Sequence, residues 1–158
     1  MNYRKRGHLL WQAVPNQQLL PIIAVSIHSM NNTLSGKKKR LLLVDDDMDT
    51  KTFVLLALCR TQTYFECIQV TRVADALKAC NLHNPDLILL DYHMPGLNGI
   101  DFLKSFRKTY PESNAPIIFY SSLLTNDVKR EALMLGVNAV IARPGSVATL
   151  TRMIEEFG

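Results

Sequence analysis

The chain alternates between short apolar runs and longer segments of helical periodicity from residue 37 onward. The short runs predict five strands, and the longer segments predict five helices, one after each strand. The expected strands are residues 41–45, 66–71, 86–90, 116–120 and 139–142, and the expected helices are 50–60, 73–82, 99–109, 125–135 and 146–157. Apolar strands that alternate with helices indicate a parallel sheet covered on both faces, which is an α/β fold.

Polar residues and a glycine at the expected helix ends support these boundaries. Thr125 and Ser146 stand where the last two helices begin, and their hydroxyls can accept hydrogen bonds from backbone N–H groups of the first turn. We expect Asp47 or Asp49 to cap the first helix in the same way. Gly136 follows the fourth helix and is expected to end it.

The composition is that of an ordinary globular chain, since 47% of the 158 residues are hydrophobic and 20% are charged. This length favours one domain that folds on its own. The net charge is +4, but the excess of bases lies in residues 4–6 and 37–40, and acids outnumber bases from residue 41 onward. Such a basic segment either contacts nucleic acid or anionic lipid or is a solvated run, and we favour the solvated run.

Residues 1–36 differ in character from the rest of the chain. Their apolar stretch, residues 19–27, is too short to span a bilayer. Pro21 interrupts that stretch and no small-residue cleavage site follows it, so we expect neither export nor a membrane anchor. We expect residues 1–36 to be a poorly ordered extension, with Met30 as an alternative start, and residues 37–158 to form the domain.

The three cysteines, Cys59, Cys67 and Cys80, lack the spacing of a metal site. Their odd number leaves at least one without an intramolecular disulfide partner. Cys59 and Cys80 lie among apolar residues of expected helices, so we expect buried free thiols in a reducing compartment.

The residues that can bind a ligand or take part in a reaction follow the expected strands. Asp45 and Asp46 follow the first strand, Asp91 the third, Ser121 the fourth and Arg143 the fifth. The carboxyl ends of parallel strands meet at one edge of a sheet, where open α/β sheets bind their ligands. Carboxylate oxygens suit Mg2+, a basic side chain offsets charge on phosphate oxygens, and a carboxylate can accept a group covalently. This set therefore favours phosphoryl transfer.

Four segments together resemble a known family. They are residues 42–47, residues 85–99, Ser121 and the pair Arg143-Pro144. On these motifs, residues 38–157 resemble the receiver domain of response regulators in bacterial two-component signalling, which is a cytoplasmic protein class. The resemblance implies a flavodoxin-like three-layer sandwich with a parallel five-stranded sheet of order 2-1-3-4-5 and five helices, and a switch point between strands one and three.

The resemblance also implies roles for individual residues. Asp91 would accept a phosphoryl group from a sensor histidine kinase or a phosphotransfer protein. Asp46 would bind Mg2+, or Mn2+, directly, Asp45 would assist through water, and the main-chain carbonyl of His93 would supply another oxygen. Ser121 would bond the phosphoryl group.

Two positions depart from the family pattern. Arg143 stands where the family has a lysine, and Arg is bulkier and planar, so phosphorylation could be slowed or lost. Val140 stands where the family often has the aromatic residue that reports phosphorylation. The Arg143–Pro144 peptide bond is expected to be cis, because the family uses that bend to turn the cation into the site.

We therefore expect a stand-alone receiver that accepts a phosphoryl group and switches a surface for an unknown downstream protein. It would be no enzyme beyond self-phosphorylation from small donors and self-dephosphorylation. We expect no DNA-binding domain, no membrane contact, and a monomer or weak dimer. The alternative is a degenerate receiver that binds a partner without phosphorylation. A haloacid-dehalogenase-like phosphatase, suggested by Asp45 and Asp47, is less favoured because Asp91 and its loop have no place in it.

Overall fold

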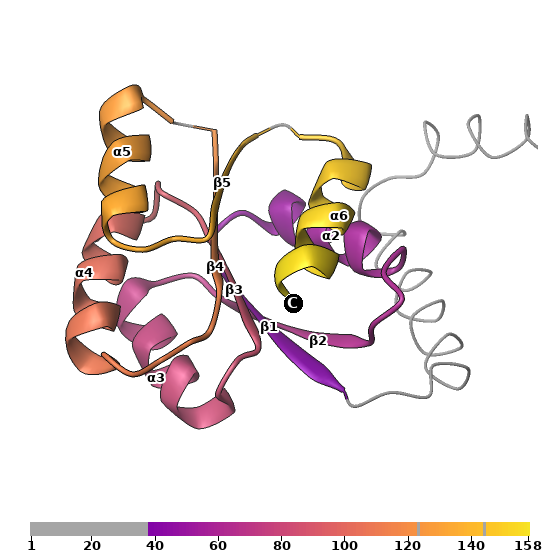
Figure 1. The fold of residues 1–158 in the computed structure, drawn as a ribbon, viewed down its shortest axis with the longest axis horizontal. Coiled ribbons are helices and arrows are strands. Elements are labelled where there is room, and N and C mark those ends of the chain that lie inside the picture. Colours follow the sequence, from indigo (N-terminus) through magenta and orange to yellow (C-terminus); the bar gives the residue numbers. More distant parts are fainter. Residues whose placement is uncertain (1–37, 123, 144) are drawn as a thin grey trace, which may run out of the picture.

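The strands form one parallel sheet in the computed structural model, which describes residues 38–122, 124–143 and 145–158. The sheet has five strands in the order β2-β1-β3-β4-β5. The strands are β1 Lys39–Val44, β2 Phe65–Val70, β3 Leu87–Leu90, β4 Ile117–Ser121 and β5 Ala139–Ala142. The helices are α2 Met48–Leu58, α3 Val73–His83, α4 Gly99–Thr109, α5 Asn126–Met134 and α6 Val147–Phe157. Figure 1 shows their arrangement.

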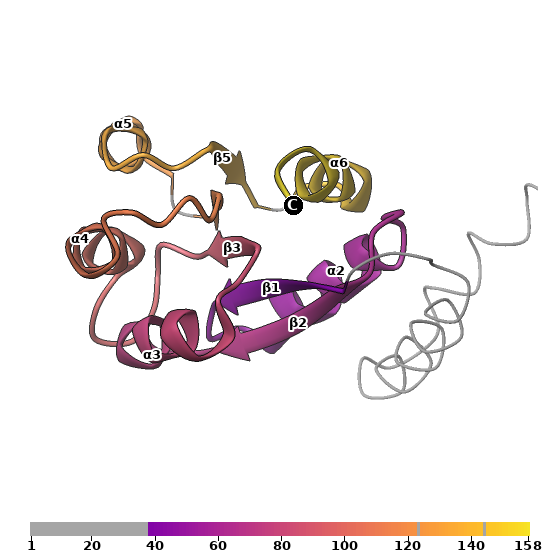
Figure 2. The same ribbon diagram turned by 60° about the horizontal axis from the view of Figure 1, so that its bottom comes forward.

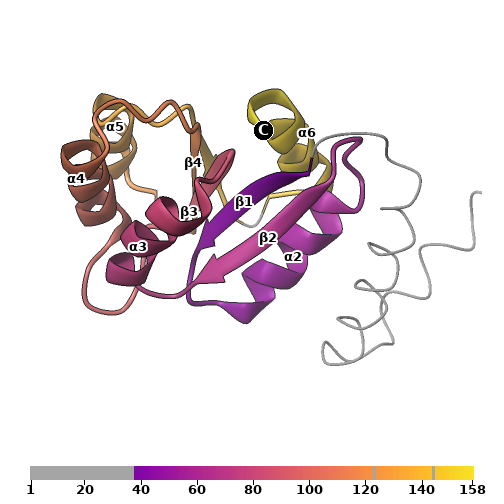
Figure 3. The ribbon, with the colours of Figure 1, turned by 90° about the horizontal axis from the view of Figure 1, so that it is seen from below.

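Helices cover both faces of this sheet. Helices α3, α4 and α5 lie on one face, and α2 and α6 lie on the other (Figures 1 and 2). Side chains alternate between the faces along each strand. In β1, Leu42 and Val44 therefore join the apolar cluster with α3, α4 and α5, whereas Leu41 and Leu43 join the cluster with α2 and α6. Figure 3 shows β1 and β2 side by side above α2.

The fold class expected from the sequence is confirmed, with small differences at the ends of elements. The helix α2 begins two residues earlier than expected, because the Asp47 carboxylate accepts a hydrogen bond from Asp49 N. Thr125 and Ser146 cap α5 and α6 as expected. Gly136 follows α5 with a φ of 79°, a left-handed conformation that favours glycine.

The expectation for the cysteines is wrong in one respect. Cys80 is a buried free thiol, but Cys59 is only partly buried, because it stands at the C-terminal cap of α2 rather than on its inner face. Cys67, on β2, is also free and partly buried. Burial raises the pKa of the Cys80 thiol to about 12 and that of Cys67 to about 11, which favours unreactive thiols.

Two expectations fall on parts of the chain outside the described residues. They are the poorly ordered extension at residues 1–36 and the cis peptide bond before Pro144. Among the described residues, no helix is both long enough and apolar enough to cross a membrane.

Candidate functional site

Neighbouring strands place the acidic residues side by side. Asp45 follows β1 and Asp91 follows β3, and these strands pair so that Val44 lies opposite Leu90. The Asp91 backbone N–H continues the pairing and donates to the carbonyl of Val44, with N and O 2.9 Å apart. As a result, carboxylate oxygens of Asp45, Asp46 and Asp91 lie within 4.8 Å of one another.

The three carboxylates differ in their exposure to solvent. Asp45 is fully buried, Asp91 is 3% exposed, and Asp46 is exposed. Burial raises the pKa of Asp45 to about 6, although the hydrogen bond from Asp47 N and the charge of Arg143 act in the opposite direction. Two carboxylates buried at one place need cationic compensation, because desolvation disfavours their charged forms.

Hydrogen bonds fix the loop that carries Asp45. The Asp47 backbone N–H donates to Asp45 Oδ1 at 2.8 Å, and the Gln69 side chain donates from Nε2 to the Asp45 carbonyl at 2.9 Å. Gln69 lies on β2 and also reaches the Asp47 carbonyl, 3.4 Å away. Gln69 could not be identified from the sequence, because a polar residue on a strand carries no signal until the pairing of β1 with β2 is known.

Arg143, which follows β5, supplies the cation. Its Nη1 lies 3.0 Å from Asp45 Oδ2, and its Nη2 lies 2.8 Å from Asp91 Oδ1. The Arg143 side chain is only 15% exposed. One guanidinium therefore bridges two of the three carboxylates, in a way that a single ammonium group cannot match.

The site also contains polar atoms with no hydrogen-bond partner. Within the described residues, the only buried side-chain atoms of this kind are Asp91 Oδ1 and Arg143 Nε. The contact between Asp91 Oδ1 and Arg143 Nη2 is thus an ion pair without hydrogen-bond geometry. Such atoms are rare in folded proteins, and here both belong to one ion pair at the carboxyl edge of the sheet.

The loop after Asp91 is held close against its backbone by α4. The side chain of Asn98 accepts hydrogen bonds from Ile100 N and Asp101 N, and Asp101 Oδ2 accepts one from Asn98 N, which completes a capping box. Gly99, the first residue of α4, approaches so closely that an added Cβ would lie 2.3 Å from the Asp91 carbonyl oxygen. Only glycine fits at this position.

The remaining expected site residues occupy the same edge of the sheet or its loops. Ser121 is fully buried and ends β4 instead of following it, and its carbonyl accepts a hydrogen bond from Arg143 N at 2.8 Å. The His93 side chain is exposed in the loop after β3. Val140, on β5, packs against the apolar cluster that contains Phe119.

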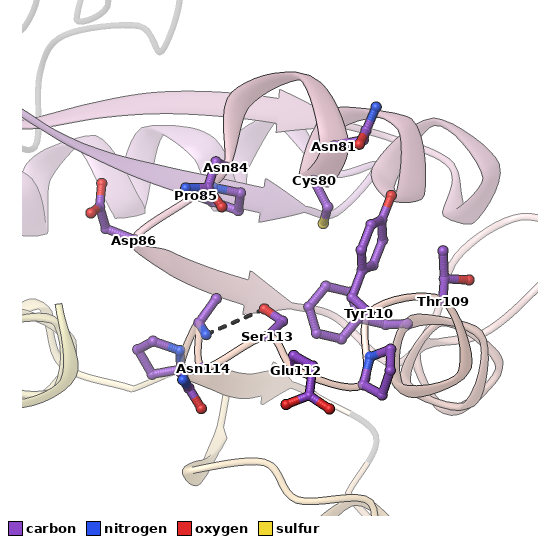
Figure 4. A pocket seen from close by; sticks show the side chains of 14 residues that line it. Cys80, Asn81, Asn84, Pro85, Asp86, Thr109, Tyr110, Glu112, Ser113 and Asn114 are labelled. Carbon is purple, nitrogen blue, oxygen red and sulfur yellow. Dashed lines mark hydrogen bonds between the residues drawn. The ribbon is translucent and has the colours of Figure 1, made fainter.

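A hollow lies at the opposite end of the strands and is separate from the acidic residues. Its volume is about 760 Å3. Figure 4 shows Cys80 and Asn81, near the end of α3, facing Tyr110 and the loop before β4 across it. The hollow is lined by Cys80, Asn81, Asn84, Pro85, Asp86, Phe106 and residues 109–116. These residues precede β3 and β4 or end α3 and α4, so the hollow is not part of the acidic site.

Comparison with known proteins identifies the family. A model of the response regulator receiver domain matches residues 41–155, which span all five strands from Leu41 onward. The chain belongs to this family. The resemblance drawn from the motifs is thus confirmed, and the motif residues around Asp91 and Arg143 lie inside the matched region.

Some relatives are matched over most of their length, and others are longer proteins that are matched over about a third of theirs. The chemotaxis protein CheY of Pseudomonas aeruginosa is 26% identical over 116 residues, which are 73% of this chain and 94% of that protein. The protein-glutamate methylesterase/protein-glutamine glutaminase of Trichodesmium erythraeum is 32% identical over 124 residues, which are 75% of this chain but 34% of that protein. The chain thus spans about a third of that relative, and 28% of the cyclic di-GMP phosphodiesterase response regulator RpfG of Xanthomonas campestris.

Solved structures share the fold. The receiver domain of Francisella response regulator 1452 superposes with a TM-score of 0.66 at 28% identity, over 75% of this chain and 95% of that one. The chemotaxis protein CheY4 of Vibrio cholerae superposes with a TM-score of 0.67 at 21% identity, over 77% of this chain and 100% of that one.

Proposed function

We propose that this receiver accepts a phosphoryl group on Asp91 and acts as a stand-alone regulator in a phosphorelay. The observation that carries the proposal is the buried Asp91 carboxylate at the end of β3, grouped with Asp45 and Asp46 and paired with Arg143. The match to 94% of the length of the chemotaxis protein CheY of Pseudomonas aeruginosa supports this proposal.

The residues of the site fit a divalent cation. Three carboxylates with oxygens within 4.8 Å of one another suit Mg2+ or Mn2+, both of which prefer oxygen ligands. We propose that Asp46, Asp91 and the His93 carbonyl hold the cation directly, with Asp45 acting through water. A bound cation would neutralise charge on the phosphoryl oxygens.

The transfer itself needs few groups of the chain. One carboxylate oxygen of Asp91 forms a bond to the phosphorus of a phosphohistidine on a kinase or phosphotransfer protein, and the phosphorus–nitrogen bond breaks with its electron pair left on the imidazole. Arg143 lies beside Asp91 and offsets the added negative charge. Its Nε–H, which lacks an acceptor among the described residues, is a donor for an incoming phosphoryl oxygen.

Incubation with Mg2+ and acetyl phosphate, followed by intact-mass analysis, tests the proposal. We expect one phosphoryl adduct in the wild-type protein and none in Asp91→Asn. Asp86→Asn is the matched control, because Asp86 is an acid beside the same strand but at its opposite end, where it accepts from Arg40 N. Absence of the adduct in wild type, or its persistence in Asp91→Asn, would contradict Asp91 as the acceptor.

One observation favours a second candidate function, a receiver that binds its partner without phosphorylation. Arg143 already pairs with both Asp45 and Asp91, so the acceptor carboxylate has a cationic partner without any ligand. This candidate predicts no phosphoryl adduct with acetyl phosphate and no NMR shifts with beryllofluoride. The leading proposal predicts that the adduct forms and that the shifts occur.

A further inference from the structure

The guanidinium of Arg143 is held from several sides. Beyond the two carboxylates, its Nη1 donates a hydrogen bond to Thr50 Oγ1. Its central carbon lies 5.4 Å from the ring centroid of Tyr120, within the range of a cation–π contact. Thr50 is 4% exposed and Tyr120 is 2% exposed, so both contacts are shielded from water.

The two groups that hold Arg143 are themselves fixed. Thr50 lies in the first turn of α2, where its hydroxyl donates to Asp47 Oδ2 at 3.3 Å. The Tyr120 ring stacks on Phe53, also of α2, with centroids 6.4 Å apart and ring planes 12° apart. The helix α2 therefore supplies one contact to the guanidinium directly and supports the other.

We propose that Thr50 and the ring of Tyr120 are positioning residues that hold Arg143 across Asp45 and Asp91 as an internal cation in competition with a bound metal ion. This inference rests on the metal-binding part of the proposed function. A divalent cation in the proposed site would use Asp91 directly and Asp45 through water, and these are the two carboxylates that Arg143 bridges. Each contact that stabilises the bridge therefore weakens metal binding.

The bridge depends on the shape of arginine and not only on its charge. The guanidinium donates from Nη1 to Asp45 and Thr50 and places Nη2 2.8 Å from Asp91, whereas a lysine ammonium is a compact point charge on a stem of different length. Arg143→Lys keeps the charge but loses the simultaneous contacts. If the bridge competes with metal, this variant binds metal more tightly. If only charge matters, its affinity equals that of wild type.

Titration with Mn2+, with free Mn2+ counted by electron paramagnetic resonance, measures the affinity without any phosphoryl transfer. We expect Arg143→Lys and Thr50→Val to bind Mn2+ about tenfold more tightly than wild type, the scale of losing one hydrogen bond to a charged group. Thr50→Ser keeps the hydroxyl, so its affinity for Mn2+ should equal that of wild type. Thr52→Val is the matched control, because Thr52 is also buried on α2 but bonds only the Met48 carbonyl among the described contacts.

Three outcomes would overturn the inference. One is an unchanged affinity in both Arg143→Lys and Thr50→Val while the wild-type protein binds Mn2+. Another is weaker binding in Thr50→Val, which would make Thr50 a support of the acidic loop and not of a competitor. Absence of binding in every protein would refute this inference and the metal site together. Binding by the variants alone would support it. Melting temperatures of the same proteins show whether each variant is folded.

Discussion

Replacing Gly99 with alanine should separate α4 from the backbone of Asp91. An added Cβ would lie 2.3 Å from the Asp91 carbonyl oxygen and 3.1 Å from the Cα of Tyr92. Protein Cβ atoms keep at least 3.0 Å from such neighbours, so the helix start must move by at least 0.7 Å. That movement strains or breaks the hydrogen bond from Gly99 N to the Tyr92 carbonyl, now 2.9 Å. Overpacking costs about 1–3 kcal/mol and a lost hydrogen bond about 1 kcal/mol, so we expect a loss of roughly 2–4 kcal/mol.

Gly96→Ala is the matched control, because it lies in the same loop and has a different physical cost. Gly96 has a φ of 88° and no atom within 4 Å of an added Cβ, so only backbone strain of roughly 1–2 kcal/mol is expected. Urea unfolding measures both losses of stability, and incubation with acetyl phosphate measures how much of Asp91 becomes phosphorylated. Only Gly99→Ala should also lower labelling. A Gly99→Ala protein as stable as wild type, with normal labelling, would refute the close-packing argument.

The other predictions concern the cap, the acidic loop and pH. Asn98→Ala removes the N-cap of α4 and should cost about 1–2 kcal/mol in urea unfolding. Gln69→Leu removes the hydrogen bond to the Asp45 carbonyl and should lower Mn2+ affinity; an unchanged affinity would exclude Gln69 as a positioning residue. The pKa of Asp45 is raised from 3.8 to about 6. Between these two pH values the folded protein binds more protons than the unfolded chain, so its free energy of unfolding falls as the pH rises from 3.8 to about 6. Because metal requires the carboxylate, Mn2+ affinity should fall as pH drops through 6, and Asp45→Asn should lack this dependence.

The grouping of the acids could be predicted from the residue pattern, and the strand order followed from the resemblance to receiver domains. An apolar run that ends abruptly in an acid marks the end of a buried strand, and this rule located Asp45 and Asp91. The different exposures of Asp45 and Asp46 could not be predicted, because adjacent residues of a loop look alike until hydrogen bonds to Asp47 and Gln69 set the loop's course.

The residues that hold Arg143 in place could not be predicted from the sequence either. A cation after β5 was predictable, but its partners Thr50 and Tyr120 looked like an ordinary helix residue and an ordinary core residue. Their role depends on how α2 packs on the sheet beside β4, and no local pattern encodes that packing. Cys59 is a similar case, since its exposure depends on where α2 ends and not on its apolar neighbours.

The ion pair between Arg143 and Asp45 joins residues 98 positions apart in the chain. The chain is synthesised from its N-terminus onward, so Asp45, after β1, and Asp91, after β3, are made before the arginine that pairs with both of them. Until β5 joins the sheet, these carboxylates repel one another at the edge where β1 and β3 must pair. Addition of β5 therefore removes an electrostatic penalty as well as adding apolar contacts, so the stability gained when β5 pairs with β4 should depend on ionic strength.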